Sequence, residues 1–313
     1  MARLLIRNGR VVSPEDKLDG TLDVLIEDGE IREIGSNLSA SAGESFDAEG
    51  QIVAPGFVDI HVHLREPGGE ISETLETGLR AAVAGGFTSV CPMPNTRPVN
   101  DNPELTSQLV SRAKDLKLAR VFPIAAATFG SQGERLTDFA ALMAAGAVGF
   151  SDDGKPVKTG GLMKEALQKA KDLGVPVIDH CEVPELSAGG VMNEGVHSKA
   201  LGLRGIPNGA EDGCIARDIE IAEATGGHLH VAHLSTAGGI QMVRRAKSRG
   251  LPVTCEVTPH HFTLTDEAVT RYGTNAKMNP PLRNQADVEA LVAGIREGVV
   301  DAIATDHAPH AAE

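Results

Sequence analysis

From residue 56 to residue 305 the sequence alternates between short apolar segments and amphipathic segments, and this alternation constrains the fold more than any other feature. Strands are predicted at residues 56–65, 87–91, 120–126, 148–151, 175–179, 228–232, 253–257 and 302–305. Helices are predicted between them at residues 71–84, 103–116, 136–145, 162–173, 211–224, 237–248 and 285–297. Strands joined by helices form parallel sheets, and eight such units favour a closed (β/α)8 barrel of the TIM type. A doubly wound open sheet is the alternative, but no G-x-G-x-x-G motif follows the first strand.

The segment before this alternation has a different pattern. Residues 1–54 contain several short apolar segments joined by turns, and Asp28-Gly29 is a typical hairpin signal. Pro55 and Gly56 mark the boundary. We therefore predict two domains, in which residues 1–54 form part of a small, β-sandwich-like domain and residues 55–313 form the barrel.

The composition excludes several classes of protein. The formal net charge is −14 and tryptophan is absent, which argues against a surface that binds nucleic acid. No apolar run approaches the roughly 20 residues that span a bilayer, and the first residues lack the apolar core of a signal peptide. A cytoplasmic protein is therefore expected, and its scattered cysteines are expected to be free thiols: Cys91, Cys181, Cys214 and Cys255.

The first strand of the alternation carries two histidines. Apolar residues alternate with polar ones here, so that His61, His63 and Arg65 lie on the same face of the strand. Two imidazoles on one rigid strand can bind a divalent cation. The alternative is a pair of hydrogen-bonded core histidines.

Further polar residues follow the other strands. The chain places ionisable side chains at the carboxyl ends of five strands, where the active site of a barrel lies: His61, His63, Asp153, His180, His233 and Asp306. This set exceeds the needs of one tetrahedral zinc and suits two metals about 3.5–4 Å apart with one bridging carboxylate. Whichever of Asp152 and Asp153 does not bind the metals would then have a structural role. Cys181 is interpreted as a small buried residue, with contact to a metal as the alternative.

Several motifs make the chain resemble a known family. The segments G-F-V-D-I-H-V-H-L-R-E-P-G and A-T-D-H-A-P-H resemble the two signatures of dihydroorotases, in the amidohydrolase superfamily. The resemblance implies a barrel with a small β domain, zinc, and the reversible interconversion of N-carbamoyl-L-aspartate and L-dihydroorotate in pyrimidine biosynthesis. Many relatives bridge their metals with a carboxylated lysine on the fourth strand. Here Lys155 and Lys158 lie beyond that strand, and the chain resembles the branch in which an aspartate, assigned as Asp153, bridges.

The expected mechanism assigns a role to each of these residues. His61 and His63 would hold one zinc, His180 and His233 the other, and a metal-activated hydroxide would attack the ring amide. Asp306 would contact the first zinc and act as general base and acid. A guanidinium can bind a carboxylate through two hydrogen bonds, which assigns Arg65 to the substrate carboxylate. The resemblance adds other substrate contacts: Asn95 and His310 on the carboxylate and Asn279 on the ring.

Two other functions remain open. An allantoinase or hydantoinase would act on substrates without that carboxylate, so Arg65 is the discriminating residue. A non-catalytic paralogue that scaffolds aspartate transcarbamoylase would lose metal ligands, whereas this chain keeps all six. The expected partners are the small-molecule substrate, further copies of the chain and aspartate transcarbamoylase. Because Glu313 directly follows the eighth strand, we expect the C-terminal part of both domains to be missing from this sequence.

Overall fold

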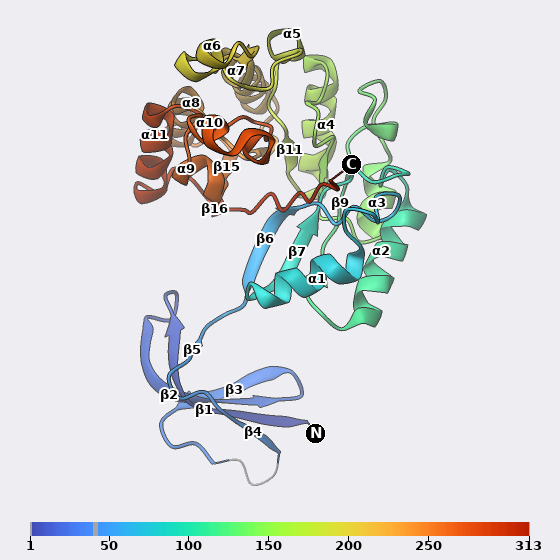
Figure 1. Cartoon of the computed structure of the whole chain (residues 1–313). Coiled ribbons are helices and arrows are strands. Elements are labelled where there is room, and N and C mark those ends of the chain that lie inside the picture. Colours follow the sequence, from blue (N-terminus) through green and yellow to red (C-terminus); the bar gives the residue numbers. More distant parts are fainter. Residues whose placement is uncertain (1, 40–42, 313) are drawn as a thin grey trace. The chain divides into compact units, whose positions relative to one another are not determined.

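A computed structural model describes residues 2–39 and 43–312 of the chain. The chain divides into two compact units, Met1–Phe57 and Val58–Glu313 (Figure 1). The division falls after Phe57, whereas the sequence predicted a boundary after residue 54.

The N-terminal unit forms one five-stranded sheet. Its strands are β1 (Arg3–Ser13), β2 (Leu18–Glu27), β3 (Glu30–Gly35), β4 (Glu44–Asp47) and β5 (Ile52–Val53). The order is β3-β2-β1-β4, and β5 also pairs with β1. Asp28 and Gly29 join the antiparallel strands β2 and β3, as the hairpin signal predicted. The described residues of this unit form one sheet, so the sandwich-like domain stays a prediction.

Apart from the short pair β12 (Met192–Asn193) and β13 (Gly205–Ile206), the described strands of the second unit form two sheets. They are β6 (Phe57–Val62), β7 (Phe87–Pro92), β8 (Arg120–Val121), β9 (Ile124–Ala126), β10 (Gly149–Ser151), β11 (Val177–Asp179), β14 (Leu229–Val231), β15 (Val253–Val257) and β16 (Ala302–Ile303). The sheet orders are β6-β7-β8 and β16-β15-β14-β11-β10-β9, and in the six-stranded sheet all the strand pairs are parallel. The predicted α/β architecture with parallel strands is confirmed.

Contacts link the two sheets at both edges. The third predicted strand is divided into β8 and β9, and its middle residues contact both sheets. Phe122 N donates to Val90 O at 3.0 Å, and Pro123 O accepts from Val148 N at 2.9 Å. At the other edge, the segment after β16 runs to the end of β6 (Figure 1), where Val62 and His307 form a parallel bridge. His63 N donates to His307 O there at 2.8 Å.

Helices connect the strands of the second unit. The larger ones are α1 (Leu75–Ala84), α2 (Pro103–Leu116), α3 (Phe139–Ala144), α4 (Gly160–Leu173), α7 (Gly209–Thr225), α8 (Ala237–Ser248) and α11 (Gln285–Arg296). Shorter elements fill the loops: α5 (Pro184–Ser187), β12 (Met192–Asn193), α6 (Val196–Leu201), β13 (Gly205–Ile206), α9 (Pro259–Thr263) and α10 (Ala268–Tyr272). Helix α1 begins at Leu75 rather than at the predicted residue 71, because the Thr74 hydroxyl accepts from Thr77 N at 3.1 Å and caps the helix there.

The main core of the second unit lies between the six-stranded sheet and its helices. Phe150 of β10 and Phe139 of α3 stack with ring centroids 3.6 Å apart, and Leu167 of α4 is fully buried beside them in the same cluster. This packing fixes the strands whose carboxyl ends carry the predicted site. In the described part of the chain, no helix has the length and apolar character needed to cross a membrane.

Candidate metal centre

The two histidines of the first strand face one point. His61 lies in β6 and His63 directly follows it, and both are buried. Both rings direct Nε2 at Asp306 Oδ1, at 3.6 Å from His61 and 3.1 Å from His63. The period-2 pattern therefore predicted their common direction correctly.

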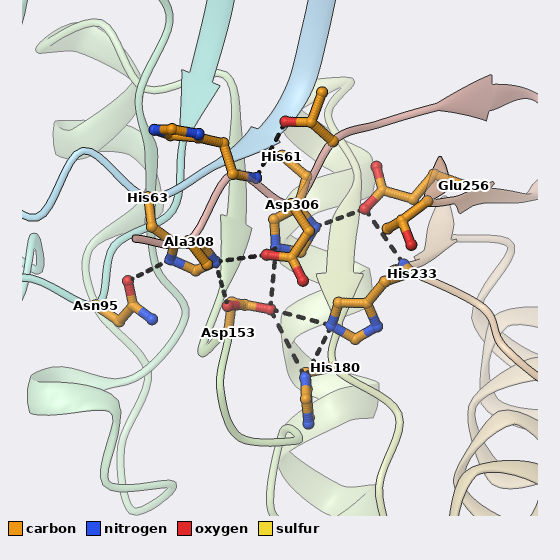
Figure 2. Close-up of polar contacts among 12 residues, drawn as sticks. His61, His63, Asn95, Asp153, His180, His233, Glu256, Asp306 and Ala308 are labelled. Atoms are coloured by element: carbon orange, nitrogen blue, oxygen red, sulfur yellow. Dashed lines mark hydrogen bonds and ion pairs between the residues drawn. The ribbon is translucent and has the colours of Figure 1, made fainter. Parts of the chain in front are cut away.

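Asp153 lies at the centre of the predicted set (Figure 2). Its Oδ1 lies 3.5 Å from His61 Nε2, 3.6 Å from His233 Nε2 and 3.9 Å from His180 Nδ1, and its Oδ2 lies 3.5 Å from His63 Nε2. Oδ1 thus faces three of the histidines, and Oδ2 faces the fourth. The structure brings together all six residues that the sequence singled out.

Asp152 points elsewhere. Its carboxylate accepts from Thr128 N at 2.9 Å and from the Thr128 hydroxyl at 2.5 Å, which fixes the loop after β9. Of the two consecutive aspartates, Asp153 is the one in the cluster, and Asp152 has the structural role.

The donor atoms of this cluster fit divalent metals. In the described part of the chain, the buried atoms His61 Nε2 and Asp153 Oδ1 lack a hydrogen-bond partner, although they face each other. His180 Nδ1 and His233 Nε2 lie 2.9 Å apart, and only one proton can lie between them. Unpaired buried polar atoms cost about 1–3 kcal/mol each, a cost that a shared cation removes. Two groups have their ligand atoms within 4.8 Å of one another: His61, His63 and Asp306, and His61, Asp153 and His233.

A buried glutamate that the sequence analysis missed orients His61. Glu256 of β15 is 1% exposed, and its Oε1 lies 2.6 Å from His61 Nδ1. A carboxylate there holds the ring proton on Nδ1, so the lone pair of Nε2 faces the centre. Glu256 Oε1 also accepts from His233 N at 3.3 Å. The only signal in the sequence was a single charged residue within an otherwise uncharged strand.

Asn95 and Asn279 also contact histidines of the cluster. Asn95 Oδ1 lies 2.8 Å from His63 Nδ1, so this amide does for His63 what Glu256 does for His61. Asn279 Nδ2 lies 3.1 Å from His180 Nε2 and donates to Glu182 Oε2 at 2.9 Å. The sequence analysis assigned both amides to the substrate and did not predict these contacts.

Arg65 and His310 lie on the segments that border the cluster. Arg65 Nε donates to Pro309 O at 3.0 Å, which in the described part of the chain leaves its two Nη groups for a ligand. Burial lowers the pKa of Arg65, and the charges of Asp306 and Asp153 oppose that shift. His310 is exposed, and its Nδ1 lies 2.7 Å from Ala308 O.

The backbone is strained at three of these positions. Arg65, His233 and Asp306 have φ angles of 59°, 32° and 48°, in the left-handed region that side chains rarely adopt. Such conformations persist only where the surroundings hold them, and they cluster at functional sites. One such support is Asp59, which accepts from Thr305 N at 3.1 Å directly before Asp306.

The carboxylates of the cluster are ionised. Burial favours the neutral form of Asp306, but the hydrogen bond from His63 and the charge of His61 outweigh it and lower its pKa to about 2. Burial likewise opposes ionisation of Asp153, and the charge of His61 holds its pKa well below the ordinary value. The centre therefore presents two carboxylates and four imidazoles to a ligand.

Two comparisons with known proteins give the same family, and a third shows the fold. Residues 50–238 match the family described as Dihydro-orotase-like. The chain is 53% identical over 308 residues to a dihydroorotase of Trichlorobacter lovleyi, and 54% identical over 308 residues to one of Pelobacter propionicus. These matches cover 98% of this chain and 72% and 73% of the relatives. An L-hydantoinase of Arthrobacter aurescens has the same fold, with a TM-score of 0.85, 24% identity, and coverage of 99% of this chain and 70% of that one.

Proposed function

The chain belongs to the dihydroorotase family of cyclic amidohydrolases in pyrimidine biosynthesis, and we propose that it interconverts L-dihydroorotate and N-carbamoyl-L-aspartate reversibly at a centre of two zinc ions. The observation that carries this proposal is the position of Asp153: its Oδ2 faces His63, and its Oδ1 lies among the other three histidines, which include His180 and His233. A bridging carboxylate needs this arrangement.

We place this centre at the mouth of a closed (β/α)8 barrel formed by residues 55–313. The links at β8–β9 and between Val62 and His307 support closure, because they leave the two sheets joined at both edges. The six residues lie in the last residues of five different strands or shortly after them, at the carboxyl ends, the usual position of a barrel active site.

The donor set divides between two cations. One cation would be held by His61, His63 and Asp306, and the other by His180 and His233. Asp153 would contact both cations. His61 Nε2 is also within reach of the Asp153 and His233 atoms, but its 3.6 Å distance to Asp306 Oδ1 and its place beside His63 favour the first cation. When bound, such cations lower the pKa of water to about 7 and polarise a carbonyl group.

Asp306 moves the proton in this scheme. The carboxylate is ionised near neutral pH, as a base must be, and its contacts in the described part of the chain use Oδ1. During hydrolysis Asp306 would accept a proton from the attacking water. As the ring C–N bond breaks, the same proton would pass to the departing nitrogen, so the carboxylate is regenerated.

Arg65 would orient the substrate. Its Nη groups can form two hydrogen bonds with the substrate carboxylate, and its position near Asp306 places that carboxylate beside the reacting amide. His310 would assist on the same carboxylate, and so would Asn95 through its Nδ2, which has no hydrogen-bond partner in the described part of the chain. Asn279 would contact the ring from the His180 side.

The resemblance further supports association with other copies of the chain and with aspartate transcarbamoylase. Neither association is needed for the assignment of the residues above.

A substrate comparison tests the reaction. The zinc-loaded chain is assayed with L-dihydroorotate, hydantoin and allantoin under identical conditions, with a chelated sample as the control. Only L-dihydroorotate carries a carboxylate for Arg65, so we expect its kcat/KM to exceed the others at least 100-fold, the order expected when one charged group is left unpaired. Equal or faster turnover of hydantoin or allantoin would contradict the proposal.

A further inference from the structure

A second cluster of ligand-type side chains lies at the end of β11, next to His180. Asp179 and Cys181 flank His180, and because side chains alternate along an extended segment they point away from the centre described above. Cys214 and Asp218, one turn apart on α7, face them. All four side chains are between 0% and 3% exposed. We call Asp179, Cys181, Cys214 and Asp218 the thiol–carboxylate cluster.

The distances in this cluster match one tetrahedral metal site. Cys214 Sγ lies 3.5 Å from Asp179 Oδ2 and 3.5 Å from Asp218 Oδ2, and Cys181 Sγ lies 4.0 Å and 3.8 Å from the same two oxygens. Zinc bonds of about 2.3 Å to sulfur and 2.0 Å to oxygen at tetrahedral angles separate the two ligands by about 3.5 Å. All four ligand atoms lie within 4.8 Å of one another.

Hydrogen bonds orient both carboxylates for this role. Asp179 Oδ1 accepts from Val157 N at 2.7 Å, and Asp218 Oδ1 accepts from Arg217 Nε at 2.7 Å. Each carboxylate therefore turns its Oδ2 toward the two sulfurs. Metal ligands are usually fixed by such outer contacts, which leave one atom free to coordinate.

In the described part of the chain, the inward atoms have as partners only one another and Arg217. Thiols are weak donors, and the nearest cation, Arg217, has its Nη2 3.3 Å from Cys214 Sγ and 3.6 Å from Asp179 Oδ2. With both thiols deprotonated the cluster would carry four negative charges, of which Arg217 would offset one. A divalent cation would offset two more in a site that is closed to water.

We propose that the thiol–carboxylate cluster binds one zinc ion with a structural role, separate from the zinc ions of the catalytic centre. Zinc suits the mixed sulfur and oxygen ligands, and closed four-ligand sites are typical of structural zinc. The ion would fix the end of β11 against α7 and thereby the backbone that carries His180.

Cobalt is the probe for this site. The full chain is produced in cells supplied with Co²⁺, because the site is closed in the folded protein. Thiolate-to-cobalt charge transfer absorbs in the near ultraviolet, and the catalytic centre proposed above contains no thiolate ligand. Wild type should show this band, and Cys214→Ala should lose it together with one bound cobalt per chain. The matched control is Cys91→Ala, another buried thiol outside the cluster, which should retain both.

Several results would overturn the proposal. These are a wild-type spectrum without the band, a band that survives in Cys214→Ala, or only two titratable thiols after unfolding, which would reveal a disulfide instead. Cys214→Ser, which nearly preserves the side-chain volume, serves where Cys214→Ala does not fold. The spectrum of the wild type and its number of bound cobalt ions per chain test the proposal even without a variant. Neither measurement depends on turnover of L-dihydroorotate.

Discussion

Glu256→Gln perturbs the metal centre without touching any proposed ligand. Glu256 holds the proton of His61 on Nδ1 through a contact of 2.6 Å in a site that is closed to solvent. Glutamine keeps the volume and one acceptor but removes the charge. Metal binding should weaken, because the His61 lone pair at Nε2 is then less basic and its tautomer less strongly fixed.

The magnitude follows from the kind of hydrogen bond that is lost. A bond to a charged partner contributes about 1.5–3 kcal/mol and a neutral one about 0.5–1.5 kcal/mol. The difference of about 1–1.5 kcal/mol corresponds to a loss of roughly tenfold in affinity. This estimate lies at the lower end of the 10–100-fold range that is typical for outer partners of metal-binding histidines.

The assay is competition for zinc with a chromophoric chelator, on the wild type, Glu256→Gln and Glu289→Gln. Glu289 is exposed on α11 and serves as the matched control, with an expected affinity equal to that of the wild type. Thermal unfolding followed by circular dichroism confirms that each variant is folded. Wild-type zinc affinity in a folded Glu256→Gln protein would refute the role of Glu256.

Three further perturbations test other parts of the account. Asp306→Asn at saturating zinc should lower kcat about 10²–10⁴-fold, the usual contribution of a general base, whereas Asp301→Asn should leave it unchanged. Turnover of Asp306→Asn near the wild-type value with zinc bound would show that Asp306 is not the base. Arg65→Lys should raise KM for L-dihydroorotate about tenfold with little change in kcat, because lysine cannot form the paired hydrogen bonds. An unchanged KM would exclude Arg65 from carboxylate binding. Zinc affinity should continue to rise as the pH increases above about 6.5, the ordinary pKa of histidine. Burial opposes the charged form of His61, but the neighbouring carboxylates raise the pKa of His61 well above that value. Protons therefore compete with the metal at neutral pH. An affinity that is flat from pH 6 to pH 9, measured by the same competition assay, would contradict this.

Patterns local to one strand were read correctly from the sequence. The alternation around His61 and His63 fixed their common direction, because the side-chain period of a strand leaves no other arrangement. The strand–helix alternation brought Asp153, His180 and Asp306 to one end of parallel strands.

Contacts between side chains on different strands were not predictable. Nothing near Glu256 in the sequence shows that it faces His61, 195 residues away. The contact of Asn95 with His63 likewise depends on how two strands pair, and the resemblance that assigned Asn95 to the substrate did not indicate it. Cys181 was interpreted as a buried apolar residue, and its place beside Cys214 depends on the packing of α7 against β11.

The most direct test of the two-zinc dihydroorotase proposal is the turnover of L-dihydroorotate by one preparation in three states: zinc-loaded, stripped by a chelator, and reloaded with zinc. We predict ring opening in the loaded sample, its loss after stripping, and its return on reloading. Equal turnover in all three states, or none in a loaded sample whose centre is shown to hold zinc, would contradict the proposal.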